Sequence, residues 1–269
     1  MKGKKKTLGL ALGAGGWKGL AHIGVIKVLV ENNISIDYIA GSSAGALVGG
    51  LYVALGDIYQ VEKIANKLTY RDLISALADP SIVSGVFKGE KVVEFLTKLV
   101  GEVNIEELSI PFSAVTSNLL TGQTSPIMKG NLARAIRASS SVPLVFQPIT
   151  HKGQYYADGA ASMPVPVKIV RNMGADIIVA VNLYGNMFSS NELLNTKRPG
   201  PINAAQIAHS LLIYNLALAN SRLADLEIDP KIPGLGGDPL SGFVGNSKAI
   251  KKGEQAMKKN LSRLKELLV

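Results

Sequence analysis

Short apolar segments alternate with helical segments through the first half of the chain, and this order constrains the fold more than any other feature. Residues 7–13 and 34–40 are predicted strands, and residues 18–31 and 44–55 are predicted helices. Such an order is typical of a mainly parallel sheet with helices over both faces. The segment 44–55 is apolar nearly all round, so we expect its helix to be buried. The sequence therefore predicts an α/β fold.

The remaining elements follow with weaker periodicity. The predicted helices are residues 57–68, 88–99, 131–138 and 166–173, and the predicted strands are residues 111–118, 123–128 and 176–183. Residues 204–218 and 245–269 are also predicted to be helical. A chain of 269 residues can close one substantial core. We therefore expect a single domain over residues 1–269, with its motifs between about 7 and 184 and a divergent helical part over about 200–269.

Composition excludes several classes of protein. The chain has no Cys, so it forms neither disulfides nor a thiolate zinc site. Its net charge is +9, but aromatic residues make up only 6% and do not interleave with basic ones, which disfavours a nucleic-acid partner. No apolar run approaches the roughly 18 residues that span a bilayer.

The first residues imitate a signal peptide, because Lys2, Lys4, Lys5 and Lys6 precede an apolar stretch. That stretch runs directly into a glycine-rich loop and a predicted helix, so cleavage would remove a strand and its turn. We therefore expect no signal peptide and no transmembrane helix, and a cytoplasmic protein that can also contact a membrane surface.

The sequence Gly41-Ser42-Ser43-Ala44-Gly45 lies between the second predicted strand and the buried helix. It matches G-x-S-x-G, the pattern of a nucleophile elbow, in which a tight turn holds a serine hydroxyl at the edge of a sheet. Ser43 would then lie at a helix N-terminus, where partial positive charge favours developing negative charge. An unreactive turn of small residues is the alternative, and the position between strand and helix favours the elbow.

A glycine-rich loop, residues 13–19 (GAGGWKG), lies between the first predicted strand and the first predicted helix. Backbone N–H groups of such a loop can stabilise the oxyanion that forms when a serine attacks an ester. A dinucleotide-binding loop needs G-x-G-x-x-G, but Lys18 stands where the last glycine is required. A phosphate-binding P-loop fails as well, since no Gly-Lys-Ser/Thr ends the loop.

A serine nucleophile needs a base, and the candidates are Asp158 and three histidines. A carboxylate within hydrogen-bond reach can take the serine proton once burial raises its pKa, whereas a plain turn is the other interpretation of Asp158-Gly159. Asp158 followed by His209 also satisfies the Ser–Asp–His order of α/β-hydrolases, although the elbow of that fold normally follows several strands. His22, within the first helix, and His151, in a polar turn, have ordinary structural explanations.

Four blocks of sequence resemble the patatin-like lipid acyl hydrolases, in particular their small bacterial-type members. The glycine-rich opening of that family is matched by residues 13–24, with Ala14 for one glycine and Lys18 for arginine, and its elbow is matched by residues 41–45. Its Ser-x-x-x-Pro-x-x-Phe-x-Pro segment resembles residues 139–148, and its Asp-Gly-Gly/Ala block resembles residues 158–160. The order and spacing of the blocks make the resemblance specific.

The resemblance implies a three-layer α/β/α sandwich and a serine acyl hydrolase of phospholipase A, lysophospholipase or esterase type. It assigns a catalytic dyad to Ser43 and Asp158, without a catalytic histidine, and an oxyanion hole to the backbone N–H groups of Gly15, Gly16 and Trp17. It implies an acyl-enzyme intermediate and neither a metal nor an organic cofactor. Trp17 also places a large ring where the family usually has a small residue, which would narrow the acyl site. A catalytically idle protein that binds lipid or acyl ligands on the same fold is the alternative.

The last predicted helix carries an apolar stripe among many basic residues. The stripe consists of Ile250, Met257, Leu261, Leu264 and Leu268. Such a stripe first of all packs on its own domain, but a basic amphipathic helix can also lie on an anionic membrane. The expected partners are therefore a lipid ester substrate and, secondarily, an anionic membrane surface, while the sequence leaves the oligomeric state open.

Overall fold

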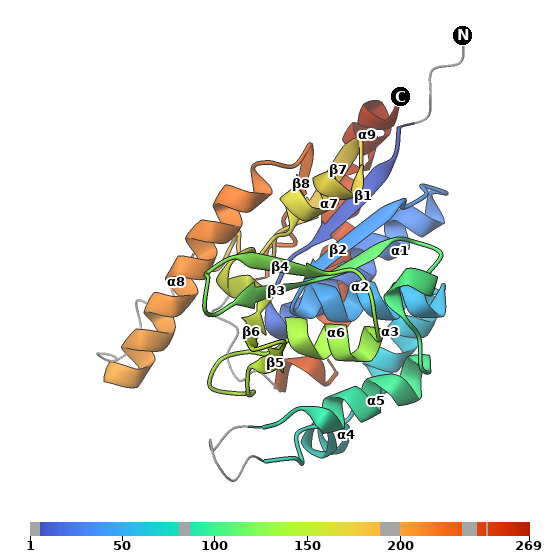
Figure 1. Cartoon of the computed structure of the whole chain (residues 1–269). Coiled ribbons are helices and arrows are strands. Elements are labelled where there is room, and N and C mark those ends of the chain that lie inside the picture. The colour runs from blue at the N-terminus through green and yellow to red at the C-terminus, as the bar shows by residue number, and fades with distance from the viewer. Residues whose placement is uncertain (1–5, 81–86, 189–199, 233–240, 246) are drawn as a thin grey trace.

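The computed structural model describes residues 6–80, 87–188, 200–232, 241–245 and 247–269, which form an α/β sandwich around an eight-stranded mixed sheet (Figure 1). Five neighbouring strands are parallel, in the order β3 (Phe112–Asn118), β2 (Tyr38–Ser42), β1 (Leu8–Leu12), β7 (Ile177–Val181) and β8 (Leu226–Ile228). Beyond β3 the pairing becomes antiparallel, with β4 (Thr124–Ile127), β6 (Gln154–Asp158) and β5 (Ile149–His151). The predicted α/β class with a mainly parallel central sheet is confirmed.

Helices cover both faces of this sheet. One face carries α1 (Ala21–Glu31), α2 (Ala44–Leu55), α3 (Ile58–Lys67), α5 (Glu90–Val100), α6 (Leu132–Ser139) and α9 (Ser247–Leu268). The other face carries α7 (Val167–Met173) and α8 (Pro201–Ser221), while α4 (Tyr70–Ala76) packs against α5. The three layers predicted by the family resemblance are therefore present.

The strand β1 shows why the sheet is buried on both faces. Leu8, Leu10 and Leu12 point to the larger helical layer, and Ala11 points to the layer that contains α7. Side chains alternate between faces along a strand, so an uninterrupted apolar segment is what a doubly covered parallel strand requires.

Most elements form close to their predicted bounds, but β2 does not. We expected a strand at 34–40, and the structure has it at Tyr38–Ser42. The reason is pairing: β2 lies between β1 and β3, and its pairs with them begin at Tyr38, opposite Gly9, and at Ile39, opposite Phe112. The short elements α4, β5, β6 and β8 were not predicted, and His151, expected in a polar turn, is the last residue of β5.

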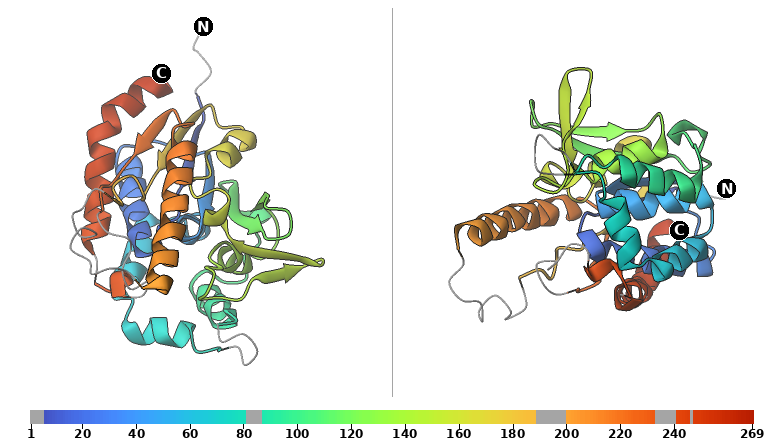
Figure 2. Two further views of the ribbon diagram at one scale, coloured as in Figure 1. Left: turned by 90° about the vertical axis from the view of Figure 1, so that its left-hand side faces the viewer. Right: turned by 90° about the horizontal axis from the view of Figure 1, so that it is seen from below.

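The long C-terminal helix α9 lies along α1 (Figure 2). Ile250, Met257 and Leu264 of its apolar stripe are buried in the core, and Leu261 and Leu268 pack against that core. The lysines of α9 are exposed. Within the described residues, we find no helix with both the length and the apolar character needed to cross a membrane.

Candidate active site

Ser43 lies in the turn between β2 and α2, at the carboxyl edge of the parallel strands. Its φ is 53°, a positive value that strains any residue other than glycine. The turn is so tight that a Cβ atom on Gly45 would lie 2.0 Å from the carbonyl oxygen of Leu12. Only glycine fits at that position, so β1 and α2 fix the turn between them. This geometry is that of a nucleophile elbow.

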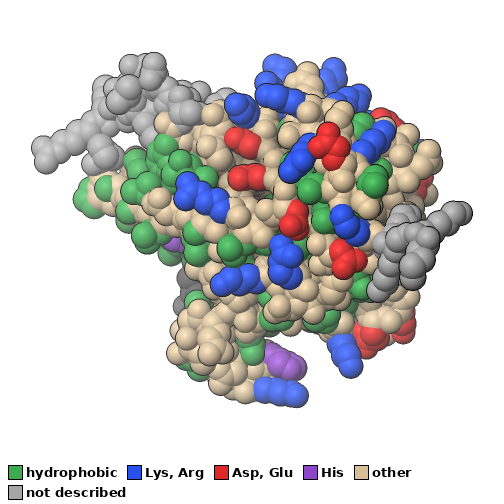
Figure 3. Space-filling view, turned by 90° about the horizontal axis from the view of Figure 1, so that it is seen from above, with side chains coloured by type: hydrophobic (Ala, Val, Ile, Leu, Met, Phe, Trp, Pro, Cys, Tyr) green, Lys and Arg blue, Asp and Glu red, His purple; other side chains and the backbone are tan. Residues whose placement is uncertain are grey.

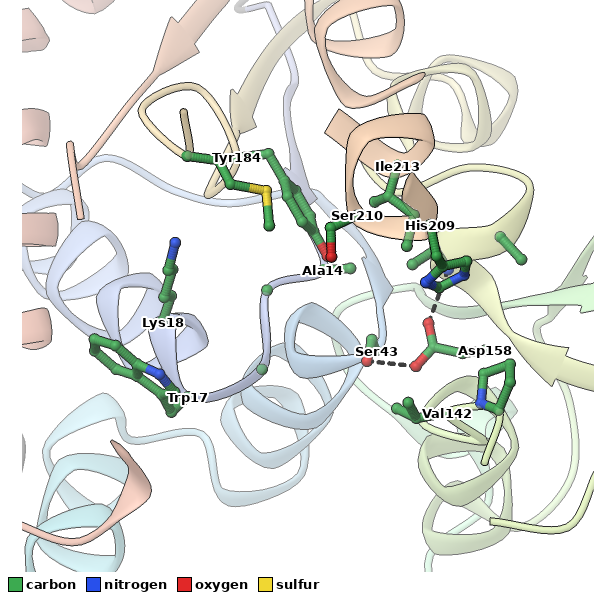
Figure 4. Close-up of a pocket in the computed structure, with 16 residues that line it drawn as sticks. Ala14, Trp17, Lys18, Ser43, Val142, Asp158, Tyr184, His209, Ser210 and Ile213 are labelled. Carbon is green, nitrogen blue, oxygen red and sulfur yellow. Dashed lines mark hydrogen bonds between the residues drawn. The ribbon is translucent and has the colours of Figure 1, made fainter. Parts of the chain in front are cut away.

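Asp158 ends β6 and faces Ser43 across the edge of the sheet (Figure 4). Ser43 Oγ donates a hydrogen bond to Asp158 Oδ2 at 2.6 Å, and the backbone N–H of Ala160 donates to Asp158 Oδ1 at 2.8 Å. The backbone of Asp158 is fixed as well, because its N–H donates to the carbonyl of Ser141 and its own carbonyl accepts from Ser117 Oγ. The carboxylate is therefore held with one oxygen directed at Ser43.

Both side chains of this pair are almost fully enclosed, with Ser43 8% and Asp158 4% exposed. Burial disfavours the charged carboxylate and raises the pKa of Asp158 to about 6, although hydrogen bonds from Ser43 and Ala160 act in the opposite direction. With this pKa, the carboxylate is more basic than an ordinary aspartate and is still ionised at neutral pH. Asp158 is thus placed to take the Ser43 proton directly.

The glycine-rich loop follows β1 and lies beside Ser43. The N–H groups of Gly13 and Ala14 donate to backbone carbonyls outside the loop, which fixes its first half. In the described part of the chain, the N–H groups of Gly15 and Gly16 donate to no other group. Both glycines line the space in front of Ser43, where a developing oxyanion would form.

Trp17 belongs to the 3-10 turn η1 (Gly16–Leu20), and its ring points away from Ser43 (Figure 4). The ring packs against Gly242, where a Cβ atom would lie 2.1 Å from the ring carbon Cγ. Trp17 nevertheless lines the cavity in front of Ser43, so the expectation that this residue narrows the acyl site stays a prediction.

The three histidines occupy different places. His22 is fully buried, its Nε2 lies 2.7 Å from the carbonyl oxygen of Gly13, and burial lowers its pKa to about 4. A neutral ring there donates Nε2–H to the glycine-rich loop. His151 is exposed on β5, and His209 is exposed on α8, where it lines the same cavity as Ser43. Ser43 meets Asp158 directly, with no imidazole between the two side chains.

A cavity of about 220 Å³, here called the Ser43 cavity, opens in front of the Ser43 hydroxyl. Its walls are mainly apolar and come from the glycine-rich loop, from Val142 and Pro143, and from Ser210 and Ile213 of α8. The helix α8 was predicted, over residues 204–218, but its place in the wall of the site was not. Tyr184, which follows β7, also lines the cavity. Burial raises the pKa of Tyr184, and the charge of Asp158 adds to this effect. The tyrosine is therefore a neutral hydroxyl inside the cavity.

Ser139 is a second residue whose role the sequence did not predict. Its Oγ accepts a hydrogen bond from the backbone N–H of Ser43 at 3.0 Å and donates to the carbonyl of Val115 at 2.6 Å. It therefore links the elbow to β3. The only signal was its position at the start of the family-like segment 139–148, which carries no information about the partner of the hydroxyl.

A second cavity of about 740 Å³ lies between α5, α6 and the β5–β6 hairpin. It is lined by Arg134, Arg137 and His151 among others, and by none of the residues assigned to the dyad or to the oxyanion hole. Across the described residues, no cluster of three or more His, Asp or Glu side chains could hold a metal ion.

Known proteins resemble this chain in sequence and in fold. The family model described as patatin-like phospholipase matches residues 10–171. An uncharacterised NTE family protein of Mycobacterium bovis is 42% identical over 178 residues, which make up 66% of this chain and 49% of that protein. The chain thus spans about half the length of this relative.

Two more distant proteins complete the comparison. Lysophospholipase nte1 of Emericella nidulans is 31% identical over 183 residues, 66% of this chain and 12% of that protein. Among solved structures, VipD from Legionella pneumophila has the same fold, with a TM-score of 0.60 and 17% identity, over 96% of this chain and 67% of that one.

Proposed function

Because the chain belongs to the patatin-like phospholipase family, we propose that it is a serine acyl hydrolase that cleaves carboxylic ester bonds of lipids. The observation that carries this proposal is the 2.6 Å hydrogen bond from Ser43 Oγ to the buried Asp158 carboxylate, at an elbow that opens into the Ser43 cavity. A protein that only bound lipid would need neither a strained serine nor a carboxylate of raised pKa beside it.

In the first half of the reaction, Ser43 Oγ attacks the ester carbonyl carbon while Asp158 takes the hydroxyl proton. The carbonyl oxygen becomes an oxyanion, which the N–H groups of Gly15, Gly16 and Trp17 stabilise. The bond to the alcohol then breaks, and the alcohol leaves with the proton from Asp158. The product on the enzyme is an acyl ester of Ser43.

In the second half, a water molecule replaces the alcohol. Asp158 takes a proton from this water while the water oxygen attacks the acyl carbon. The same N–H groups stabilise the second oxyanion. Collapse of this intermediate returns the proton to Ser43 Oγ and releases the fatty acid. The two halves need no metal and no organic cofactor.

The finer substrate class follows from the size of the Ser43 cavity. Its volume of about 220 Å³ lies below the range of roughly 300–1,000 Å³ typical of small-molecule sites. One acyl chain can enter, while the rest of the lipid remains outside. We therefore favour lysophospholipids and other single-chain esters, in keeping with the relatives that are named lysophospholipases.

The test is replacement of Ser43 by alanine. We expect Ser43→Ala to abolish hydrolysis of lysophosphatidylcholine and of a short-chain 4-nitrophenyl ester, and to abolish labelling by a fluorophosphonate. The matched control is Ser42→Ala, because the neighbouring Ser42 Oγ is buried without a hydrogen-bond partner in the described residues. Hydrolysis by Ser43→Ala at the wild-type rate would exclude this mechanism, and absence of all hydrolysis and labelling in the wild type would favour an idle lipid-binding protein.

A further inference from the structure

The helix α8 has an unusual composition for a helix at the surface. None of its 21 residues is Asp, Glu, Lys or Arg, whereas 18% of the whole chain is charged. A surface helix normally places charged side chains on its solvent face, and a helix without them is normally buried. Yet α8 is attached to the sheet mainly through its C-terminal end, where Ala217 and Ser221 are buried, and its first turns project beyond the sandwich (Figure 2).

Leucine and alanine side chains make up much of the outer side of α8. Leu211 is 44% exposed and Leu212 is 70% exposed, and Ala208 and Ala204 are exposed one and two turns before them. The exposed polar residues of α8 are Asn203, Gln206, His209 and Asn215. The amide of Asn215 is partly satisfied within the helix, because its Nδ2 donates to the carbonyl of Leu211 at 2.9 Å.

A second apolar side chain is exposed close to the Ser43 cavity. Leu144 is 85% exposed and has a φ of 69°, a left-handed conformation that leucine rarely adopts. The two residues before it, Val142 and Pro143, line the Ser43 cavity. The fold therefore accepts backbone strain to hold a leucine in solvent beside the cavity, and such strain is concentrated at functional sites.

We propose that Leu144, Leu211 and Leu212 form a docking surface for a phospholipid bilayer beside the Ser43 cavity. The inference rests on the proposed function, because its substrate would be a single-chain lipid dissolved in the bilayer. Both elements that carry these leucines also line the cavity, through Val142 and Pro143 and through Ser210 and Ile213. The docking surface is thus continuous with the cavity, and an acyl chain can pass from the bilayer to Ser43 without crossing water.

The distribution of charge also suits an anionic bilayer. Figure 3 shows apolar side chains gathered on the side where α8 lies, with basic side chains next to them. Arg222 directly follows α8 and is exposed, and the exposed Lys168 lies on α7, which packs against α8. The chain carries a net charge of +9. Cations at the border of an apolar surface attract anionic headgroups and orient the apolar side toward the acyl region.

The first experiment measures binding without turnover. Full-length Ser43→Ala protein is sedimented with vesicles of phosphatidylcholine and phosphatidylglycerol, alone and with Leu212→Gln added. Loss of one inserted leucine is expected to weaken binding roughly tenfold. The matched control is Ile74→Gln, because Ile74 on α4 is 66% exposed but does not line the Ser43 cavity, and it is expected to leave binding unchanged.

Two further measurements separate the possible explanations. Leu144→Gly relieves the positive φ, so we expect it to keep or raise the melting temperature while it weakens vesicle binding. In the otherwise wild-type enzyme, Leu212→Gln is expected to lower the ratio of two turnovers, that of lysophosphatidylcholine carried in these vesicles and that of a short ester, and Ile74→Gln is expected to keep this ratio. Failure of the proposed function would instead be seen as the absence of all turnover.

Three outcomes would overturn the proposal. They are undetectable vesicle binding by the Ser43→Ala protein, equal binding by the proteins with and without Leu212→Gln, and a wild-type dimer that Leu212→Gln converts to monomer without changing vesicle binding. The last would make this surface a contact between two copies of the chain.

Discussion

The Ser43 cavity has two walls that differ in origin and in what holds them. The first wall consists of the glycine-rich loop and the elbow, and it comes from the first 55 residues. The second wall consists of Val142, Pro143, Asp158 and residues of α8, and Ser139 and Leu144 lie close to the first two of these in the chain. Backbone packing fixes the first wall, since a Cβ atom on Gly45 has no space beside Leu12.

The second wall depends on individual side-chain links and on a strained leucine. Ser139 connects it to the elbow, and Leu144 has a positive φ. The nucleophile and the proposed oxyanion donors thus lie in the rigid wall, while the base and the proposed lipid entrance lie in the wall built from distant segments. This division suits the proposed lipid hydrolase, because the reaction needs atoms held in fixed positions and the entrance has to accept acyl chains of varied shape.

The largest effect is expected at Asp158, where the second wall contributes to the chemistry. We expect Asp158→Asn to lower hydrolysis at least about a hundredfold, the lower end for loss of a general base. The control is His209→Ala in the same wall, which should stay within about tenfold of the wild type if the dyad operates alone. An inactive but folded His209→Ala protein together with an active Asp158→Asn protein would reopen the Ser–Asp–His triad.

Asp158→Asn should also stabilise the protein at neutral pH. The pKa of Asp158 is raised from 3.8 to about 6 in the folded state, so the folded state holds a proton that the unfolded state has already lost between these values. Stability is therefore highest below pH 4 and falls as pH rises through about 6, by on the order of 3 kcal/mol. Asparagine does not ionise, so the Asp158→Asn protein avoids this loss of stability. Thermal denaturation should show a higher melting temperature for Asp158→Asn at pH 8, and no difference near pH 4.

The pH dependence of turnover provides the next test. The base has to be ionised, so kcat/KM on a neutral ester should rise about tenfold per pH unit below the pKa of Asp158, about 6, and level off above it. A rate–pH profile in the wild type checks this. A profile whose midpoint disappears in His209→Ala would assign the base to the imidazole instead.

His22 and Ser139 allow the two walls to be weakened one at a time. Since His22 Nε2 meets the carbonyl of Gly13, His22→Ala leaves a buried carbonyl unpaired and a cavity beside it. We expect a loss of roughly 3 kcal/mol in unfolding free energy, with activity falling in parallel. His151→Ala is the control, because it removes an imidazole ring that is exposed. An unchanged melting temperature in His22→Ala would contradict the role of His22 in holding the glycine-rich loop.

Ser139→Ala should have a smaller effect on stability and a more selective one on rate. It removes the acceptor of the Ser43 N–H and the donor to the Val115 carbonyl. Leaving such a buried group unpaired lowers the unfolding free energy by roughly 1–3 kcal/mol. We expect kcat to fall about tenfold with little change in KM, because the hydroxyl positions Ser43 and does not touch substrate. Ser140→Ala, at the next position, is the matched control, and equal losses in both variants would rule out a specific link.

The first wall could be predicted from the sequence because its determinants are local. The turn of Ser43 and the loop at Gly15 are each specified by glycines within a few residues, between elements of clear period. The second wall could not be predicted in the same way. Asp158 was one of several candidate bases, and only a short block of family-like sequence assigned it to the dyad, because the strand β6 that carries it pairs with residues about forty positions away.

The same contrast between local and distant determinants applies to the helices α8 and α9. The apolar stripe of α9 and the uncharged sequence of α8 both indicate a helix that must cover its apolar side, but neither says with what. The structure supplies the answer for α9, which packs on α1. Contacts between residues over two hundred positions apart, such as the one between Lys27 and Glu254, decide this packing, and no local pattern contains them.

The smallest effect is expected from the lysines of α9, and it tests which of the two C-terminal helices meets the membrane. Replacing Lys251, Lys252, Lys258 and Lys259 by glutamine leaves the buried stripe intact, because all four side chains are exposed. The helices α9 and α8 cover opposite faces of the sheet, and each layer is about 10 Å thick. A charge on α9 is thus farther from a bilayer at α8 than the screening length of about 8 Å in physiological salt. We expect vesicle binding to fall less than about threefold, against the roughly tenfold loss for Leu212→Gln. A larger and salt-sensitive loss of vesicle binding in the lysine variant, together with unchanged binding in Leu212→Gln, would place the membrane contact at α9. The exposed leucines of α8 would then have no role in membrane binding.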